Sequence, residues 1–183
     1  MYSRNSEPVR FERDCEAVLV PAGDQVTLPA GTVGYITQSL GGSWTVFVEG
    51  NLMRIAGKDA DAISKEPPAP IELPEGATDE DVERLVWQQL RTCFDPEIPV
   101  NIVELGLVYA AEVVPRDDGR RDVRVRMTLT APGCGMGEVL VDDVRSKVEL
   151  IPTVAEADVE LVFDPPWNQT LMSDVAKLET GML

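Results

Sequence analysis

The stretch DVRVRMTLTAPGCGMG, residues 122–137, decides the fold of the second half of this chain. Between Asp122 and Thr130, apolar residues alternate with arginine and threonine. A period of two predicts a strand with one buried face and one wetter face. A Gly-rich turn around Cys134 follows, and apolar residues then recur at helical spacing over Glu138–Glu149. The stretch therefore predicts a strand, a tight turn and a helix in direct succession.

Cys134 is the candidate functional residue of this stretch. A thiol on a Gly-rich turn at the start of a helix is expected to be exposed, and the helix dipole favours its thiolate form. The chain contains no histidine, so no imidazole is available to act as a base for this thiol. The same absence excludes Ser-His-Asp and Cys-His catalysis and histidine-based zinc sites.

Further elements flank the central stretch on both sides. An N-cap at Thr78 and an acidic first turn predict a helix that places Cys93 towards the core. Two more strands are expected at Leu107–Val114 and Ala157–Phe163, and a last helix at about Gln169–Glu179. The resulting order, α-β-β-α-β-α, predicts a two-layer α/β domain on a three-stranded mixed sheet.

The first part of the chain has a different pattern. Residues 16–56 contain short β-like runs, and Gly41-Gly42 marks a tight hairpin. The segment SKEPPAPIELPEGA, residues 64–77, has the composition of an extended linker. We therefore expect an α+β protein with a small all-β, SH3-like domain at 1–63, a Pro-rich linker at 64–77 and the α/β domain at 78–183.

Composition narrows the functional classes. The 183 residues carry a formal net charge of −16 and a pI near 4.3, which argues against nucleic acid and anionic membranes as partners. No apolar run approaches the roughly 20 residues of a membrane span. Three scattered cysteines, with Cys15 as a bystander thiol, do not form a disulfide framework. These features predict a protein of the cytoplasm.

Three unusual segments are expected to meet at one end of the sheet. Because the first two strands form a hairpin, residues 95–106 enter the sheet at the end where the Cys134 turn leaves it. A third strand parallel to the second would bring Asp164–Trp167 to that end as well. The meeting point would combine one thiol with the carboxylates of Asp95, Glu97, Glu104 and Asp164.

Such a set of groups can bind iron. Thiolate and carboxylate are both iron ligands, and thiolate suits iron–sulfur clusters in particular. The carboxylates oppose the helix dipole, since neighbouring anions raise the pKa of a thiol. One cysteine cannot enclose a cluster that usually takes four thiolates. Any cluster or iron at Cys134 would therefore be transient and shared with a partner or a second copy, so a homodimer is one possibility.

The chain also resembles a known family. The motifs are DPEIP at 95–99, NIVELGLVY at 101–109, MTLTAPGC at 127–134 and DPPW at 164–167. In this order they resemble the iron–sulfur cluster assembly family, which includes SufT-like and PaaD-type proteins. The resemblance spans about residues 78–183. Many relatives carry Cys-Pro where this chain has Cys134-Gly135, so the turn is expected to be looser here.

The resemblance implies a compact α/β domain and an auxiliary role in maturing iron–sulfur proteins. Its characteristic cysteine falls on Cys134, and its DPE motif falls on Asp95, Pro96 and Glu97. It also implies SUF assembly proteins and iron–sulfur client proteins as partners. A metal-free adaptor that targets this machinery to clients is the alternative. A thiol-dependent enzyme is a third reading, but only carboxylates and lysine could activate the thiol, so we expect no enzyme.

Overall fold

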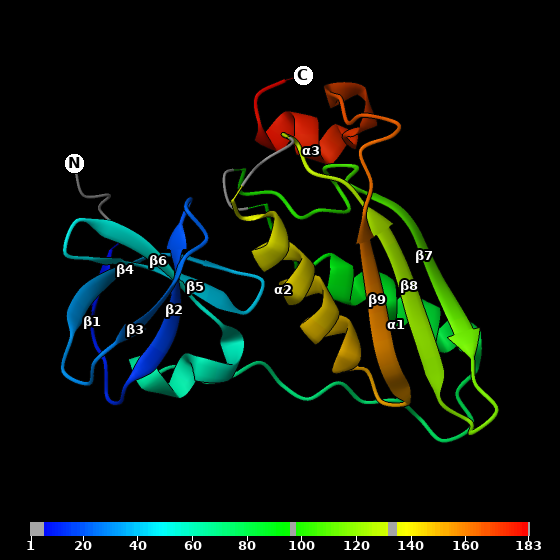
Figure 1. Cartoon of the computed structure of the whole chain (residues 1–183), viewed down its shortest axis with the longest axis horizontal. Coiled ribbons are helices and arrows are strands. Elements are labelled where there is room, and N and C mark those ends of the chain that lie inside the picture. The colour runs from blue at the N-terminus through cyan, green and yellow to red at the C-terminus, as the bar shows by residue number, and fades with distance from the viewer. Residues whose placement is uncertain (1–5, 96–97, 132–134, 183) are drawn as a thin grey trace. The chain divides into compact units, whose positions relative to one another are not determined.

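The computed structural model describes residues 6–95, 98–131 and 135–182. The chain divides into two compact units, Met1–Ala69 and Pro70–Leu183 (Figure 1). The first unit contains an antiparallel sheet, and the second a mixed sheet with helices. The α+β fold class expected from the sequence is confirmed.

The first unit is built on six antiparallel strands in the order β1-β4-β5-β6-β2-β3, with a 3₁₀ helix, η1, after the last of them. Their bounds are β1 Glu7–Arg10, β2 Cys15–Val20, β3 Gln25–Leu28, β4 Val33–Leu40, β5 Ser43–Val48, β6 Asn51–Ile55 and η1 Gly57–Ile63. The hairpin around Gly41-Gly42 is confirmed, since β4 and β5 pair directly across it.

Two features of this unit differ from expectation. Strand β1 lies in a charged segment for which we predicted no strand; it buries only Val9, so it has almost no apolar pattern to detect. Cys15 does not precede the first strand but opens β2, where its side chain is buried. Strand β1 lies at the edge of the sheet, and an edge strand is held by backbone hydrogen bonds that leave little trace in the sequence.

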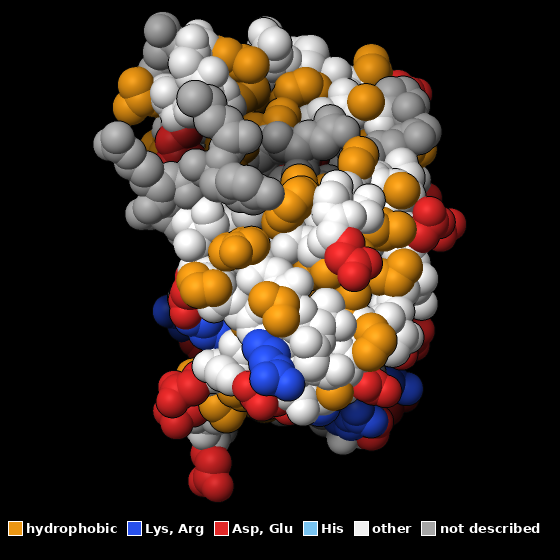
Figure 2. All heavy atoms as spheres, turned by 90° about the vertical axis from the view of Figure 1, so that its left-hand side faces the viewer, with side chains coloured by type: hydrophobic (Ala, Val, Ile, Leu, Met, Phe, Trp, Pro, Cys, Tyr) orange, Lys and Arg blue, Asp and Glu red, His pale blue; other side chains and the backbone are white. Residues whose placement is uncertain are grey.

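The outward face of this sheet carries a row of apolar side chains. Pro8, Tyr35, Phe47, Leu52 and Val20 lie directly opposite one another on five neighbouring strands. Tyr35 is 43% exposed and Leu52 39% exposed. Figure 2 shows hydrophobic side chains exposed on the face that it turns to the viewer.

The second unit has a three-stranded sheet in the order β7-β8-β9. Its elements are α1 Asp79–Leu90, β7 Val108–Pro115, β8 Arg121–Met127, α2 Gly137–Glu149, β9 Val154–Leu161, a 3₁₀ helix η2 Gln169–Leu171 and α3 Asp174–Glu179. Strand β8 pairs antiparallel with β7 and parallel with β9, as expected. Helices α1 and α2 pack on one face of the sheet (Figure 1).

Helix α1 shows why the second unit forms where it does. Thr78 accepts a hydrogen bond from the backbone of Asp81, and the Asp81 carboxylate accepts one from the backbone of Thr78. This reciprocal capping box satisfies two amides at the start of the helix and also lowers the pKa of Asp81. Val82, Val86 and Leu90 then occupy one face and are fully buried. The predicted N-cap and apolar face are confirmed.

The last predicted helix, Gln169–Glu179, is wrong as a single element. The chain forms η2, breaks at Met172 with an extended backbone, and begins α3 after Ser173. The Ser173 hydroxyl accepts a hydrogen bond from the backbone of Ala176 and so caps the new helix. Ser173-Asp174 is itself a helix-start signal.

None of the helices within the described residues is long and apolar enough to cross a membrane.

Candidate functional site

The loop between α1 and β7 forms one side of the candidate site. It folds back on itself through an isolated bridge between Phe94 and Asn101. The Asn101 side chain accepts hydrogen bonds from the backbone of Val103 and Glu104, at 3.1 and 3.0 Å. Ile102, Leu105 and Leu107 are fully buried, so the loop is anchored in the core of the unit.

Asp95 sits in this loop and is only 8% exposed. Its carboxylate accepts a hydrogen bond from the backbone of Ile98 at 3.1 Å. The contact gives Asp95 a structural role in shaping the loop. A ligand role of this carboxylate towards iron stays a prediction.

The segment that follows β9 lies against the same loop. The Trp167 indole donates a hydrogen bond to the backbone oxygen of Leu105 at 2.7 Å. The Tyr109 hydroxyl donates to the backbone oxygen of Pro165, also at 2.7 Å, and the backbone N–H of Ser173 donates to the backbone oxygen of Glu104 at 2.8 Å. The expectation that the Asp95 loop and the DPPW segment meet at one end of the sheet is therefore confirmed. Asp164 itself is exposed.

Gly106 makes the close approach of these two segments possible. Its φ of 73° lies in the left-handed region, and a Cβ built on it would stand 2.2 Å from the backbone oxygen of Leu171. Only a residue without a side chain fits this position. Sequence reasoning missed this contact, although Gly106 stands between two buried leucines, where glycine is otherwise unexpected.

Thr128 is the second position that sequence reasoning missed. The alternation placed it on the wetter face of its strand, yet it is 1% exposed. Its backbone N–H donates to the oxygen of Leu107 at 2.8 Å, one residue beyond the end of β8. Its hydroxyl oxygen is buried and has no hydrogen-bond partner among the described residues. The alternation of residues along a strand does not indicate which positions are covered by loops outside the sheet. The prediction that Thr128 is exposed failed for this reason.

Cys134 and Glu97 lie outside the described residues, so their roles stay predictions. The sequence around Cys134 joins the end of β8 at Met127 to the start of α2 at Gly137. The N-cap of α2, Met136, makes no side-chain capping bond. The first amides of α2 therefore begin without a capping side chain from the N-cap residue.

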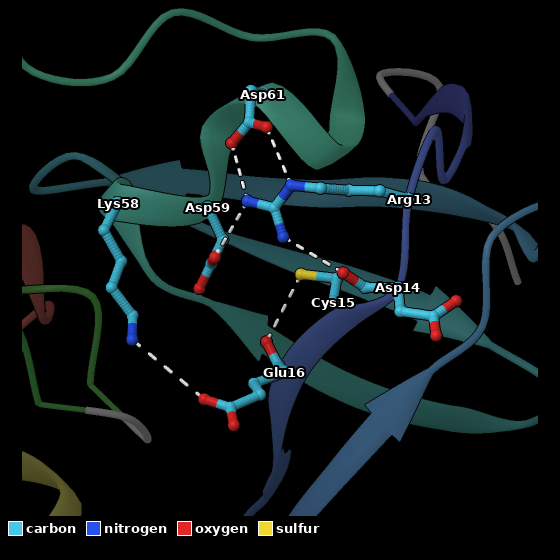
Figure 3. Close-up of polar contacts among 7 residues, drawn as sticks. All are labelled: Arg13, Asp14, Cys15, Glu16, Lys58, Asp59 and Asp61. Atoms are coloured by element: carbon cyan, nitrogen blue, oxygen red, sulfur yellow. Dashed lines mark hydrogen bonds and ion pairs between the residues drawn. The ribbon is translucent and has the colours of Figure 1, made fainter.

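Cys15 is not suited to act as a reactive thiol. It is 1% exposed and donates a hydrogen bond to the backbone oxygen of Glu16 (Figure 3). Burial is the main cause that raises its pKa to about 11, and Asp59 adds to the shift. The thiol is therefore protonated at neutral pH, as expected of a bystander.

The same close-up shows how the segment before Cys15 is held. The Arg13 guanidinium pairs with Asp61 at 2.7 Å and with Asp59 at 3.0 Å, both on η1 (Figure 3). The hydrogen bond from Arg13 holds the pKa of Asp61 below its usual range. The cluster ties η1 to the sheet and serves the structure of the first unit.

Cys93 is fully buried in the core of the second unit, and its thiol donates to the backbone oxygen of Gln89 at 3.5 Å. The prediction that Cys93 is structural is confirmed by this burial. Within residues 6–95, 98–131 and 135–182, no group of three or more cysteine, aspartate or glutamate side chains is placed to hold a metal ion.

The site lies inside a region that matches a family model. Residues 83–160 match the model described as "Iron-sulfur cluster assembly protein". This range contains Asp95, Glu97 and Cys134 and falls entirely within the second unit.

Curated proteins of three bacteria are similar to the chain. A Porphyromonas gingivalis protein, "Fe-S protein maturation auxiliary factor", is 46% identical over 106 residues, which cover 58% of this chain and 93% of that protein. "Fe-S protein maturation auxiliary factor SufT" of Staphylococcus aureus is 40% identical, covering 48% of this chain and 96% of that protein. The Bacillus subtilis protein of the same description, YitW, is 35% identical, covering 57% and 98%. Since nearly the whole length of these relatives is matched, this chain belongs to the iron–sulfur cluster assembly protein family.

Proposed function

We propose that this protein is an auxiliary factor in the maturation of iron–sulfur proteins. The observation that carries the proposal is the match to nearly the full length of relatives described as Fe-S protein maturation auxiliary factors. Cys134 lies inside the matched family region. The role is one of handling and delivery, without catalysis of a chemical reaction.

In this proposal the Cys134 thiolate is the ligand that takes up iron or a cluster as cargo. Asp95, Glu97 and Asp164 are its candidate helpers. Two of these fit the role differently: Asp95 is buried and tied to its loop, whereas Asp164 is exposed and open to a cation. A thiolate with one or two carboxylates is a suitable but incomplete set for iron.

Incomplete ligation fits a carrier better than a storage site. A cluster that usually takes four thiolates would need ligands from a partner protein or a second copy. Sharing the ligands makes release easy, because the donor keeps only part of the coordination. The partners implied are proteins of the assembly machinery and their iron–sulfur clients.

A second candidate is a metal-free adaptor. The apolar row of Pro8, Tyr35, Phe47, Leu52 and Val20 supports it. Pro8, Tyr35 and Leu52 are exposed, and such a surface can hold a partner protein without any metal. In the adaptor the Cys134 thiol would be dispensable. The first unit would then be essential.

The two candidates differ in a cell-based test. Cells that depend on this protein would carry Cys134→Ser, the matched control Cys15→Ala, or a chain that lacks residues 1–69. The carrier predicts that Cys134→Ser abolishes the activity of iron–sulfur enzymes while Cys15→Ala retains it. Iron–sulfur enzyme activity that stays normal with Cys134→Ser and is lost only when the first unit is deleted would contradict the carrier role and support the adaptor role.

A further inference from the structure

The C-terminal part of the second unit exposes four large apolar side chains, of which Val175 and Leu178 lie three residues apart on α3. Leu171 is 41% exposed, Val175 56%, Leu178 70% and Met182 45%. We call these four residues the C-terminal stripe. The core contacts of this segment are made by Met172 and Ala176, which are 4% and 0% exposed. The C-terminal stripe is therefore additional to the core and faces outward.

The segment that carries the stripe is anchored to the candidate site. Its Ser173 backbone N–H donates to the backbone oxygen of Glu104 at 2.8 Å, and Leu171 lies against Gly106. Within the segment, the Met182 backbone N–H donates to the backbone oxygen of Lys177 at 2.7 Å. In Figure 1, α3 lies at the end of the sheet to which β8 and β9 point. An exposed apolar surface is thus held next to the loop that contains Asp95.

The charge around the stripe indicates what can approach it. The described residues 94–95, 98–107, 128–131, 135–138 and 162–182 contain six carboxylates and one cation, Lys177, so their formal net charge is 1 − 6 = −5. The carboxylates are those of Asp95, Glu104, Glu138, Asp164, Asp174 and Glu179. A second copy would bring a further −5 against this surface, and like charges across an interface oppose association. A basic partner would be attracted instead.

We propose that the C-terminal stripe is the docking site for a partner protein that presents an amphipathic helix with an apolar face bordered by lysine and arginine. The partner's apolar side chains would cover Val175 and Leu178, and its basic borders would meet Asp174 and Glu179. This inference rests on the proposed function, since the docked protein would lie beside the site that handles the cargo. It names the chemistry of the partner that receives or supplies the cargo.

The test is a titration of the full chain against a synthetic helical peptide with leucine along one face and lysine along both borders. Fluorescence anisotropy of the labelled peptide gives the Kd. We expect Leu178→Asp to weaken binding about tenfold or more, as loss of a central apolar contact does. The matched control is Leu150→Asp, which adds the same charge at another exposed leucine. Leu150 is 63% exposed and follows the C-terminal end of α2. Leu150→Asp is expected to leave the Kd within about twofold.

Two results would overturn the docking site. One is an equal loss of binding in Leu178→Asp and Leu150→Asp, or equal binding of a peptide with glutamate borders. The other is sedimentation of the wild type as a dimer that Leu178→Asp dissociates, because a second copy would then occupy the stripe. The titration uses no iron and does not require Cys134. Its outcome is therefore independent of whether Cys134 carries cargo.

Discussion

Replacement of Gly106 by alanine tests how the two segments of the site are held together. The residue has a φ of 73°, which costs an L-amino acid about 1–2 kcal/mol. The new Cβ would also stand 2.2 Å from the backbone oxygen of Leu171, so the backbone itself must move. Overpacking of this kind costs roughly 1–3 kcal/mol. We therefore expect Gly106→Ala to lower the free energy of unfolding by about 2–5 kcal/mol in total.

The assay is urea unfolding followed by circular dichroism, with Gly119→Ala as the matched control. Gly119 has a φ of 81° in the β7–β8 turn, and a Cβ there would meet nothing within 4 Å. The control therefore isolates the backbone cost of about 1–2 kcal/mol. The difference between the two variants measures the contact with Leu171. Equal destabilisation by the two alanines would refute the close packing of the C-terminal segment on the loop.

Three further predictions use single side chains. Trp167→Phe removes the hydrogen bond to Leu105 and should lower the free energy of unfolding by about 1–3 kcal/mol in the same assay, since a buried carbonyl loses its donor. Thr128→Val should raise it by about 1 kcal/mol, because a buried hydroxyl without a described partner is removed; a loss of stability would show that the hydroxyl is bonded. The folded chain keeps the Cys15 proton up to about pH 11, whereas an unfolded thiol loses its proton near pH 8.5. The free energy of unfolding should therefore fall as pH rises between these values, and Cys15→Ala should flatten the slope in urea titrations at several pH values.

Much of the second unit could be predicted because its patterns are strong. The alternation in residues 122–127 and the capping box at Thr78 each specify one element from a few residues. The hairpin and the helical crossover then leave few ways to arrange three strands, and the direct parallel pairing of β8 and β9 is one of the arrangements that they allowed. The domain boundaries at 63 and 77 stay predictions.

The failures are local and share a physical cause. The break at Met172 was missed because helical spacing of apolar residues continued across it, while Ser173 started a new helix. The alternation of residues predicted that Thr128 is exposed, yet it is buried. The prediction failed because the burial of a strand end depends on loops that are distant in sequence. The contact of Gly106 with Leu171 joins residues far apart in sequence, which no local pattern encodes.

The candidate site was predicted in part. The meeting of the Asp95 loop with the DPPW segment followed from the strand order and is confirmed by the hydrogen bonds of Trp167 and Tyr109. The ligand roles of Cys134, Asp95, Glu97 and Asp164 are chemical properties that strand order does not determine. They remain the proposal that experiment must test.

Anaerobic reconstitution with iron and sulfide tests the central claim most directly. Wild type, Cys134→Ser and the control Cys15→Ala would be compared by visible absorption, iron per chain and mass in solution. The account predicts a cluster at a fraction per chain in wild type and Cys15→Ala, and its loss in Cys134→Ser. An equal cluster in Cys134→Ser, or none in any of the three proteins, would contradict the role of Cys134 as the ligand that carries the cargo.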